Sequence, residues 1–280
     1  MKSLPDTCAL CPRLCRHKCP VAVATGLEST TPTAIMTNLV MLGQVADTTN
    51  TEANQAIDLC TRCGECEAAC GVDQPVVDIL DAARTRHQAP PAPWQAPSIE
   101  GAGSHIAIVC SPEDWTASLK EAVDIDLASL HTHDHLGELH RIRKDTKAEV
   151  HAALRELIGD KVAICTCLTC LTALMAAGCE AIHLASFLDT QQKLPQWRTC
   201  QCSPGPGIRT MVTCCGARAP LITSHPNIAN MVAEDLHRRL DGQAVYIEDT
   251  RCSTHLKAVG TQVVDPIDRL KNMEIPNANR

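Results

Sequence analysis

Eight cysteines within the first seventy residues are spaced as ligands of iron–sulfur clusters. The first run has the pattern Cys-x-x-Cys-x-x-x-Cys-x-x-x-Cys-Pro over residues 8–20, and the second has Cys-x-x-Cys-x-x-Cys-x-x-x-Cys over residues 60–70. A cubane [4Fe-4S] cluster takes four thiolates, and a Cys-x-x-Cys-x-x-Cys loop wraps three iron corners while its backbone N–H groups point at the sulfides. The two runs therefore predict two cubane clusters.

Each cluster is expected to take three thiolates from one run and the fourth from the other, as in two-cluster ferredoxins. The resulting ligand sets are Cys8, Cys11, Cys15 and Cys70 for cluster 1, and Cys19, Cys60, Cys63 and Cys66 for cluster 2. The first run is one residue wider than the usual spacing, with Pro12 in the gap. Zinc and disulfides are the alternatives, but a zinc ribbon uses two separated pairs rather than four cysteines ended by proline.

Helices are expected to hold the two cysteine runs. Residues 32–43 begin with a proline and end with a glycine, which predicts a helix over this range. Residues 51–59 predict a second helix, capped by Asn50 or Thr51 and leading directly into the second run. The first part of the chain is therefore expected to be an all-α domain with cluster loops at its turns.

The composition favours metal binding in a reducing compartment. The chain has 18 cysteines in 280 residues, whereas disulfide-rich secreted chains are usually small and open with a signal peptide. The first ten residues contain no apolar run, and the weakly polar stretch 34–46 is too short and too polar to span a bilayer. We expect a cytoplasmic protein that meets a membrane only through a partner. A net charge of −7 without a dense Lys/Arg tract argues against nucleic acid.

The chain divides into three parts, which give the fold class α + α/β. Residues 1–88 are the all-α ferredoxin-like domain, and residues 89–104 are a linker rich in proline and alanine. From residue 105 to 280, short apolar runs alternate with helical ones, which indicates βαβ units and a mainly parallel sheet. The runs are HIAIVC, DWTASLKEAV, KAEVHAALRELI, KVAICTC, LTCLTALMAAG and AIHL, at residues 105–110, 114–123, 147–158, 161–167, 168–178 and 181–184. Segments beginning at Cys167 and Cys252 resemble each other at an offset of 85 residues, so two related repeats are expected over about 105–190 and 191–272.

The C-terminal part carries a second group of cysteines, among which the adjacent pair Cys214-Cys215 is the most informative. Adjacent cysteines do not easily close a relaxed disulfide with each other, but both thiolates can bind neighbouring irons. Together with Gly216 they form a Cys-Cys-Gly motif, and Cys252-x-x-His255 follows later in the chain.

Both parts resemble subunits of heterodisulfide reductase. The eight N-terminal cysteines are similar to the helical two-cluster module of its C subunit, which also occurs in fumarate and succinate reductases. The order of Cys202, Cys214-Cys215-Gly216 and Cys252-x-x-His255 resembles the Cys-Cys-Gly repeat of its B subunit, with relatives in glycolate- and lactate-oxidising complexes. That repeat can hold a non-cubane [4Fe-4S] cluster, close to which disulfide or quinone chemistry takes place.

The resemblance implies two further candidate sites. The possible third cluster would use Cys202, Cys214, Cys215, Cys252 and His255. The histidine stands where the family has its last cysteine, and histidine ligation raises a cluster's potential. The first repeat has no Cys-Cys pair, so it is expected to hold zinc, a cluster or nothing. Its candidate ligands are Cys110, Cys167 and Cys170, with a histidine completing a tetrahedral zinc set.

Other residues of the C-terminal part have plainer interpretations. Cys179 and Cys200 are expected to be small buried hydrophobic residues rather than ligands. The His-Thr-His-Asp-His stretch at 131–135 is expected to be a solvated polar loop rather than a metal site. Cys165 is left open between a ligand and a packed strand residue.

We expect the chain to be an electron-transfer subunit of a multi-subunit oxidoreductase, with single electrons passing through the two cubanes to or from a site in the second domain. No Gly-x-Gly-x-x-Gly or Gly-Lys-Ser/Thr motif is present, so a flavoprotein or other dehydrogenase is the expected partner. Two alternatives stay open. One is a disulfide- or quinone-reducing catalytic subunit with a non-cubane cluster at Cys214-Cys215. The other is a ferredoxin module with a zinc-bearing or metal-free scaffold domain.

Overall fold

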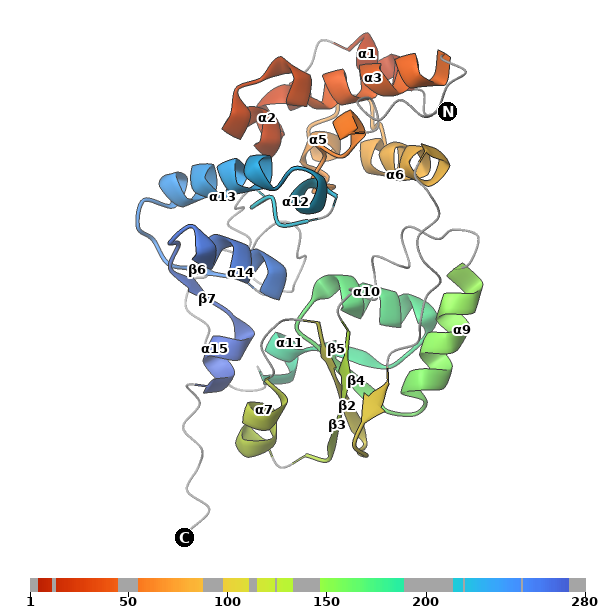
Figure 1. The fold of residues 1–280 in the computed structure, drawn as a ribbon, viewed down its shortest axis with the longest axis vertical. Helices are drawn as coiled ribbons and strands as arrows, with labels where there is room; N and C mark the ends of the chain where they lie inside the picture. Colours follow the sequence, from red (N-terminus) through yellow and green to blue (C-terminus); the bar gives the residue numbers. More distant parts are fainter. Residues whose placement is uncertain are drawn as a thin grey trace. The chain divides into compact units, whose positions relative to one another are not determined.

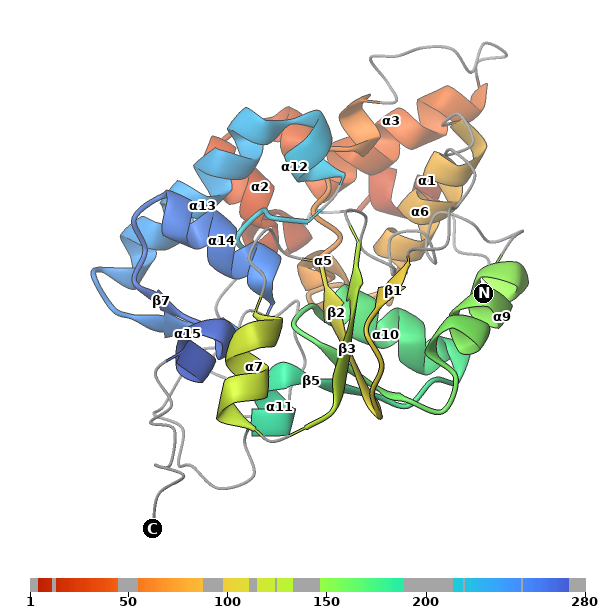
Figure 2. The same ribbon diagram turned by 60° about the horizontal axis from the view of Figure 1, so that its bottom comes forward.

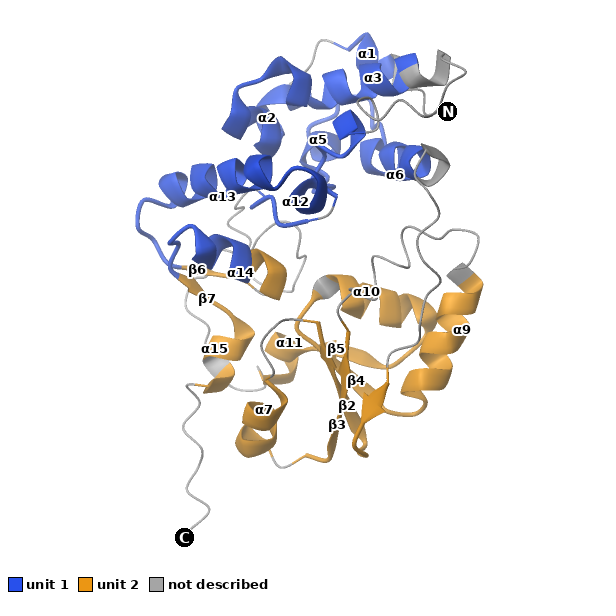
Figure 3. Ribbon diagram, in the orientation of Figure 1, with its two compact units in different colours: residues 1–90, 198–244, 254–262 blue, residues 91–197, 245–253, 263–280 orange. Residues whose placement is uncertain are grey.

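The chain folds into a helical unit and an α/β unit, which are described one at a time (Figures 1 and 3). The computed structural model describes residues 5–11, 14–44, 55–87, 98–110, 115–123, 125–132, 147–188, 214–218, 220–247 and 249–271. Unit 1 comprises residues 1–90, 198–244 and 254–262, and unit 2 comprises residues 91–197, 245–253 and 263–280. This grouping by contacts places residues 198–244 with the N-terminal residues. The predicted limits at 88 and 105 stay predictions.

Unit 1 is built from short helices around the two cysteine runs (Figure 1). Its elements are α1 (Pro5–Ala9), η1 (Leu14–Lys18), α2 (Pro20–Thr25), η2 (Glu28–Thr30), α3 (Pro32–Gln44), α5 (Glu65–Ala68), α6 (Val76–His87), α12 (Leu221–Ser224) and α13 (Pro226–Leu240). Prolines begin α2, α3 and α13, where a missing N–H has no cost. The predicted helix over 32–43 is confirmed by α3. The predicted helix over 51–59 lies partly outside the described residues.

Two apolar clusters hold unit 1 together. The first joins α3 and α6 through Ile35, Met36 and Leu80, and Cys8, Cys15 and Cys60 pack against it. The second joins α2 to the helices that follow the Cys-Cys pair, because Val21 packs with Leu221, Ala229 and Val232. Residues about 200 positions apart in the chain therefore share one core.

Unit 2 contains a five-stranded sheet in the order β1-β3-β2-β4-β5 and a two-stranded sheet of β6 and β7. The strands are β1 (Ile99–Glu100), β2 (His105–Val109), β3 (Leu127–His131), β4 (Val162–Cys165), β5 (Ala181–His183), β6 (Val245–Tyr246) and β7 (Val263–Val264). All neighbouring pairs are parallel except β1 with β3, which agrees with the expected mainly parallel sheet.

Helices cover both faces of the five-stranded sheet (Figure 2). The helices of unit 2 are α7 (Thr116–Ala122), α9 (Lys147–Ile158), α10 (Leu168–Ala177), α11 (Leu184–Leu188), α14 (Thr250–Ala258) and α15 (Pro266–Lys271), with the boundary between the units inside α14. Ile106 and Ile108 of β2 face α9 and α10, whereas Ala107 and Val109 face α7, α11 and α15. Strands covered on both faces read as continuous apolar runs, as β2 does.

The apolar and helical runs expected from residue 105 onward correspond to β2, α7, α9, β4, α10 and β5. The strand β3 had not been expected, and β1 lies within the expected linker. Ile99 comes after the last proline of that stretch and pairs with Leu130 at the edge of the sheet. The proline-rich part therefore ends before residue 104, where the linker was predicted to end. Within the described residues, no helix has the length and hydropathy that crossing a bilayer requires.

The two segments expected to be repeats form the same local order of elements. Each contains a strand, a crossover helix and a parallel strand: β4-α10-β5 in one and β6-α14-β7 in the other. In each, the Cys-x-x-(Cys/His) sequence lies at or near the start of the crossover helix. The relation between the repeats stays a prediction.

Candidate metal centres

One cavity of unit 1 is lined by the four thiols expected for cluster 2. Cys60 and Cys63 lie in the loop before α5, Cys66 lies in α5, and Cys19 precedes α2. The loop is shaped by two left-handed residues, Arg62 at φ 61° and Gly64 at φ 79°. This conformation lets the backbone N–H of Arg62 donate a hydrogen bond of 3.3 Å to the sulfur of Cys60. Such N–H donors to thiolate sulfur are typical of iron–sulfur loops.

The thiols of this cavity interact with one another. Burial raises the pKa of Cys19 to about 12, and the charges of Cys63 and Cys60 add to the rise. Burial likewise raises the pKa of Cys66, with contributions from Cys60, Cys63 and Cys19. Four thiolates this close together repel one another unless a cation lies among them. The iron ions of a cluster would supply that positive charge.

A second cavity is lined by the four thiols expected for cluster 1. Cys8 lies in α1, Cys11 follows it, Cys15 lies in η1, and Cys70 follows α5. Burial raises the pKa of Cys8 to about 11, and the charges of Cys70, Cys15 and Cys11 raise it further. The backbone N–H of Gln74 donates a 3.4 Å hydrogen bond to the sulfur of Cys70.

The two cavities share a wall. Pro32, Cys66 and Val76 line both of them. Pro32 is the first residue of α3 and Val76 is the first residue of α6, so both helices begin at this wall. The N-terminal ends of helices carry partial positive charge, which stabilises an anionic group next to them.

A buried arginine supports the cluster 2 cavity. Burial raises the pKa of Cys60, and the nearby guanidinium of Arg84 opposes that rise through its charge and a hydrogen bond. The same guanidinium pairs with Asp58 at 3.3 Å and with Asp81 at 3.0 Å, and it donates to the carbonyl of Ile57 at 2.6 Å. Asp81 also pairs with Arg62 at 2.7 Å. The cavity therefore has a fixed positive group beside one of its thiols.

The Cys-Cys-Gly motif lies in unit 1, beside the second cysteine run. Cys214 is hydrogen-bonded to the Cys63 thiol, and this bond is the largest cause of the raised pKa of Cys63, followed by burial. Arg218 donates a 3.5 Å hydrogen bond to the carbonyl of Arg62 in the same loop. Cys214 and Cys215 are both fully buried.

Gly216 allows this turn to pack closely against α13. Its φ is 86°, and a Cβ at this position would lie 2.9 Å from the carbonyl oxygen of Ala229. The Nε2–H of His255 donates a hydrogen bond of 3.1 Å to the same carbonyl oxygen, so the histidine lies beside this turn.

The other predicted ligands of a third cluster are only partly placed. Cys202 lies outside the described residues, as do Cys200 and residues 133–135 of the polar stretch. Cys252 is buried and lies on α14, three residues before His255. The hydrogen bond of His255 Nε2 leaves Nδ1 as the ring nitrogen for a metal. The third-cluster set stays a prediction.

The predicted site of the first repeat is brought together in unit 2. The sulfur atoms of Cys110, Cys167 and Cys170 all lie within 4.8 Å of one another. Cys165 is fully buried in the apolar cluster beside them, and Cys179 is half-buried against the same cluster. His131 ends β3 and is exposed.

Comparison with known proteins agrees with the two N-terminal cavities. Residues 7–74 match the family model of the 4Fe-4S dicluster domain. This domain implies two [4Fe-4S] clusters and electron transfer through them. Two cavities, each lined by the four thiols expected for one cluster and each with a backbone N–H donor at sulfur, fit such a pair. No curated protein and no solved structure matched the chain.

Sequence reasoning missed the charged groups that support the clusters. Arg84 lies among apolar residues of α6, and Arg218 lies 156 residues from the loop that it contacts. Arg84 occupies the buried face of α6 together with Leu80, and an arginine on such a face is a signal of a buried anionic partner. Arg218 comes two residues after the Cys-Cys-Gly motif, but the residues around it do not indicate that it binds the carbonyl of Arg62.

Proposed function

We propose that this protein is an electron-transfer subunit of a multi-subunit oxidoreductase, in which single electrons pass through two [4Fe-4S] clusters to or from a site at Cys214-Cys215. Cluster 1 would be held by Cys8, Cys11, Cys15 and Cys70, and cluster 2 by Cys19, Cys60, Cys63 and Cys66. The grouping of these thiols around two cavities supports both ligand sets.

The contact between Cys63 and Cys214 carries this proposal. It joins a ligand of cluster 2 directly to the Cys-Cys-Gly motif through two sulfur atoms. The shared wall at Cys66 joins cluster 2 to cluster 1 on its other side. The thiols therefore form a continuous sequence from the first cysteine run to Cys214.

The clusters supply one-electron redox chemistry when bound. The residues of the chain hold them and adjust their potentials. Arg84 and the N–H of Arg62 place positive charge at Cys60, which favours the more negative, reduced form. Burial of Cys214 and Cys215 keeps bulk solvent away from this end of the path, which suits an electron relay better than an open substrate site.

The resemblance to heterodisulfide reductase supports a role within a larger complex. We expect the partner to be a flavoprotein or another dehydrogenase that carries out the two-electron step, and we expect membrane association only through such a partner. This expectation rests on analogy between families.

The test uses the full chain, purified without oxygen, and two single variants. Stepwise reduction should take up about two electrons per chain, one for each cluster, and should reverse on oxidation. Cys214→Ala should keep its iron but alter the potential and the EPR signal of cluster 2, because it removes a group bound to Cys63 sulfur. Cys215→Ala is the matched control, because it removes the adjacent buried thiol but keeps the contact between Cys63 and Cys214.

Irreversible reduction, or a cluster 2 signal that is the same in Cys214→Ala as in the parent chain, would contradict the proposal. Turnover of a disulfide or a quinone by the chain alone would instead assign it the catalytic role.

A further inference from the structure

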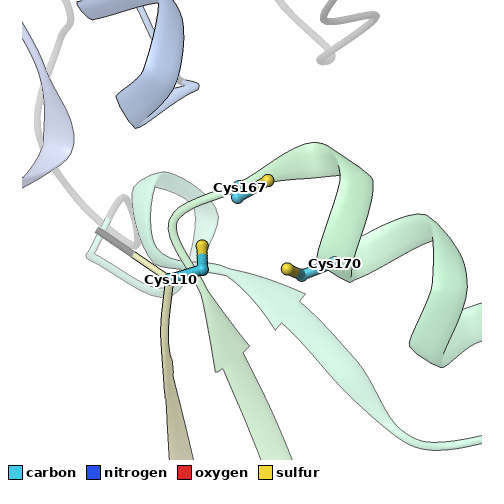
Figure 4. Close-up of side chains that lie close together, drawn as sticks. All are labelled: Cys110, Cys167 and Cys170. Carbon is cyan, nitrogen blue, oxygen red and sulfur yellow. The ribbon is translucent and has the colours of Figure 1, made fainter. Parts of the chain in front are cut away.

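Three cysteines from separate elements of unit 2 converge at one point (Figure 4). Cys110 directly follows β2, Cys167 directly precedes α10, and Cys170 lies in the first turn of that helix. Figure 4 shows the three side chains converging from these elements. Their sulfur atoms all lie within 4.8 Å of one another. Across the described residues, no other three Cys, His, Asp or Glu ligand atoms are grouped this tightly.

The topology of the sheet explains this convergence. β2 and β4 are parallel neighbours, and Ile108 is in register with Cys165. Cys110 and Cys167 each come two residues later, so both leave the sheet at the same carboxyl edge. In open α/β sheets this edge is where ligands bind.

The spacing of the sulfurs fits one metal ion rather than a cluster. Tetrahedral zinc with Zn–S bonds of about 2.3 Å places its thiolates roughly 3.8 Å apart. Thiolates of a cubane bind different irons and lie further apart, and the eight N-terminal thiols line cavities instead of meeting within 4.8 Å. Three thiolates are also a soft donor set, which favours zinc over magnesium, calcium and manganese.

The N-terminal end of α10 offsets part of the cost of placing thiolates at this buried point. Cys167 caps the N-terminal end of α10, a ten-residue helix, and Cys170 follows in its first turn, where the helix carries partial positive charge. Arg251 donates a hydrogen bond to the hydroxyl of Thr169, one of the two residues between these cysteines. Zn²⁺ with three thiolates has a net charge of −1, and the positive end of α10 lies beside it, whereas the guanidinium of Arg251 is itself paired with Asp249 at 3.7 Å.

Cys165 does not complete the set. It lies in β4 and belongs to the same apolar cluster as Cys167 and Cys170, but its sulfur is not one of the three that converge. Cys110 is only half-buried, whereas Cys167 and Cys170 are fully buried. The accessible side of the group is therefore at Cys110.

We propose that Cys110, Cys167 and Cys170 bind a single zinc ion as three thiolates, with a fourth coordination position that is open to a small external ligand. This site is independent of the two N-terminal clusters. Zinc sites with three protein ligands and an open position are those that bind and activate water or a substrate group.

Metal analysis of the full, iron-loaded chain tests the proposal. The parent chain should hold about one zinc, Cys110→Ala and Cys170→Ala should each hold less than about a tenth of that, and the iron content should not change. Cys165→Ala is the matched control and should keep its zinc. If Cys110→Ala does not fold, Cys110→Ser replaces it in this test, and circular dichroism checks that the variant is folded.

Cobalt(II) substitution tests the open position. The cobalt-loaded chain should show thiolate-to-cobalt charge transfer and tetrahedral d–d bands, and 2-mercaptoethanol should shift those bands. Several outcomes would overturn the proposal: a parent chain without zinc, zinc retained in folded Cys110→Ala or Cys110→Ser, or zinc lost from Cys165→Ala. Iron that falls by about four per chain in Cys110→Ala would show a cluster instead. Unshifted d–d bands would refute the open position.

Discussion

Replacing Arg84 by glutamine should lower the reduction potential of cluster 2 and leave cluster 1 unchanged. The guanidinium interacts with Cys60 by charge and by a hydrogen bond, and its side chain is only 9% exposed. A cation at this position stabilises the reduced cluster, which is more negative than the oxidised one. Removing the cation therefore disfavours reduction.

The size of the shift follows from the contact that is lost. A hydrogen bond between charged groups contributes about 1.5–3 kcal/mol. For a one-electron couple, 59 mV corresponds to about 1.4 kcal/mol, which gives a shift of about 60–130 mV. Asp58 and Asp81 already neutralise part of the guanidinium charge, so we expect about 60 mV.

Arg62→Gln is the matched control. Both arginines are buried and pair with Asp81, but Arg62 reaches Cys60 through its backbone N–H, which the substitution keeps. EPR-monitored redox titration of both variants gives the two potentials. Loss of a buried pair costs about 3–5 kcal/mol of stability, so urea unfolding should first show that both variants are folded. Equal shifts in the two variants, or a rise in the potential of Arg84→Gln, would refute the reasoning.

The further predictions concern stability and thiol reactivity. Gly216→Ala should lower the free energy of unfolding by about 3 kcal/mol or more, because its Cβ would meet a helix carbonyl at positive φ. Gly242→Ala, at φ 74° with open space around it, should cost about 1 kcal/mol in the same urea titration. In the metal-free chain, alkylation of Cys8 at pH 8, followed by peptide mass spectrometry, should be roughly 100-fold slower than that of an ordinary thiol. Its raised pKa favours the protonated thiol, so its contribution to stability should be present below about pH 9 and lost as the pH rises through about 11. Oxidative removal of iron should lower the melting temperature, since the clusters bind only the folded chain; an unchanged melting temperature would contradict this.

Local spacing was enough to predict α3 and several elements of the α/β part. The proline and glycine that bound residues 32–43 predicted α3, and the alternating runs from residue 105 predicted β2, α9, β4 and α10 close to their observed limits. These signals act over a few residues, where turn chemistry and apolar periodicity are strong. The strand β3 was missed because Leu127–His131 ends next to a polar stretch and lacks β-branched residues.

Contacts between distant segments were not predictable in the same way. The motif at Cys214 was expected to belong with residues 105–272, whereas the contacts group it with the first ninety residues, beside Cys63. That placement depends on Val21 packing with Leu221 and Val232, and single apolar residues do not specify their partners. The convergence of Cys110 with Cys167 was easier to predict, because both cysteines were assigned to one repeat and both follow strands.

The central claim is that residues 7–74 hold two [4Fe-4S] clusters. The most direct test is to purify the full chain without oxygen, to measure iron and acid-labile sulfide per chain, and to record Mössbauer spectra. The account predicts about eight irons and eight sulfides, all in [4Fe-4S] clusters. Iron without sulfide, about four irons per chain, or zinc in place of iron at the eight N-terminal cysteines would contradict it.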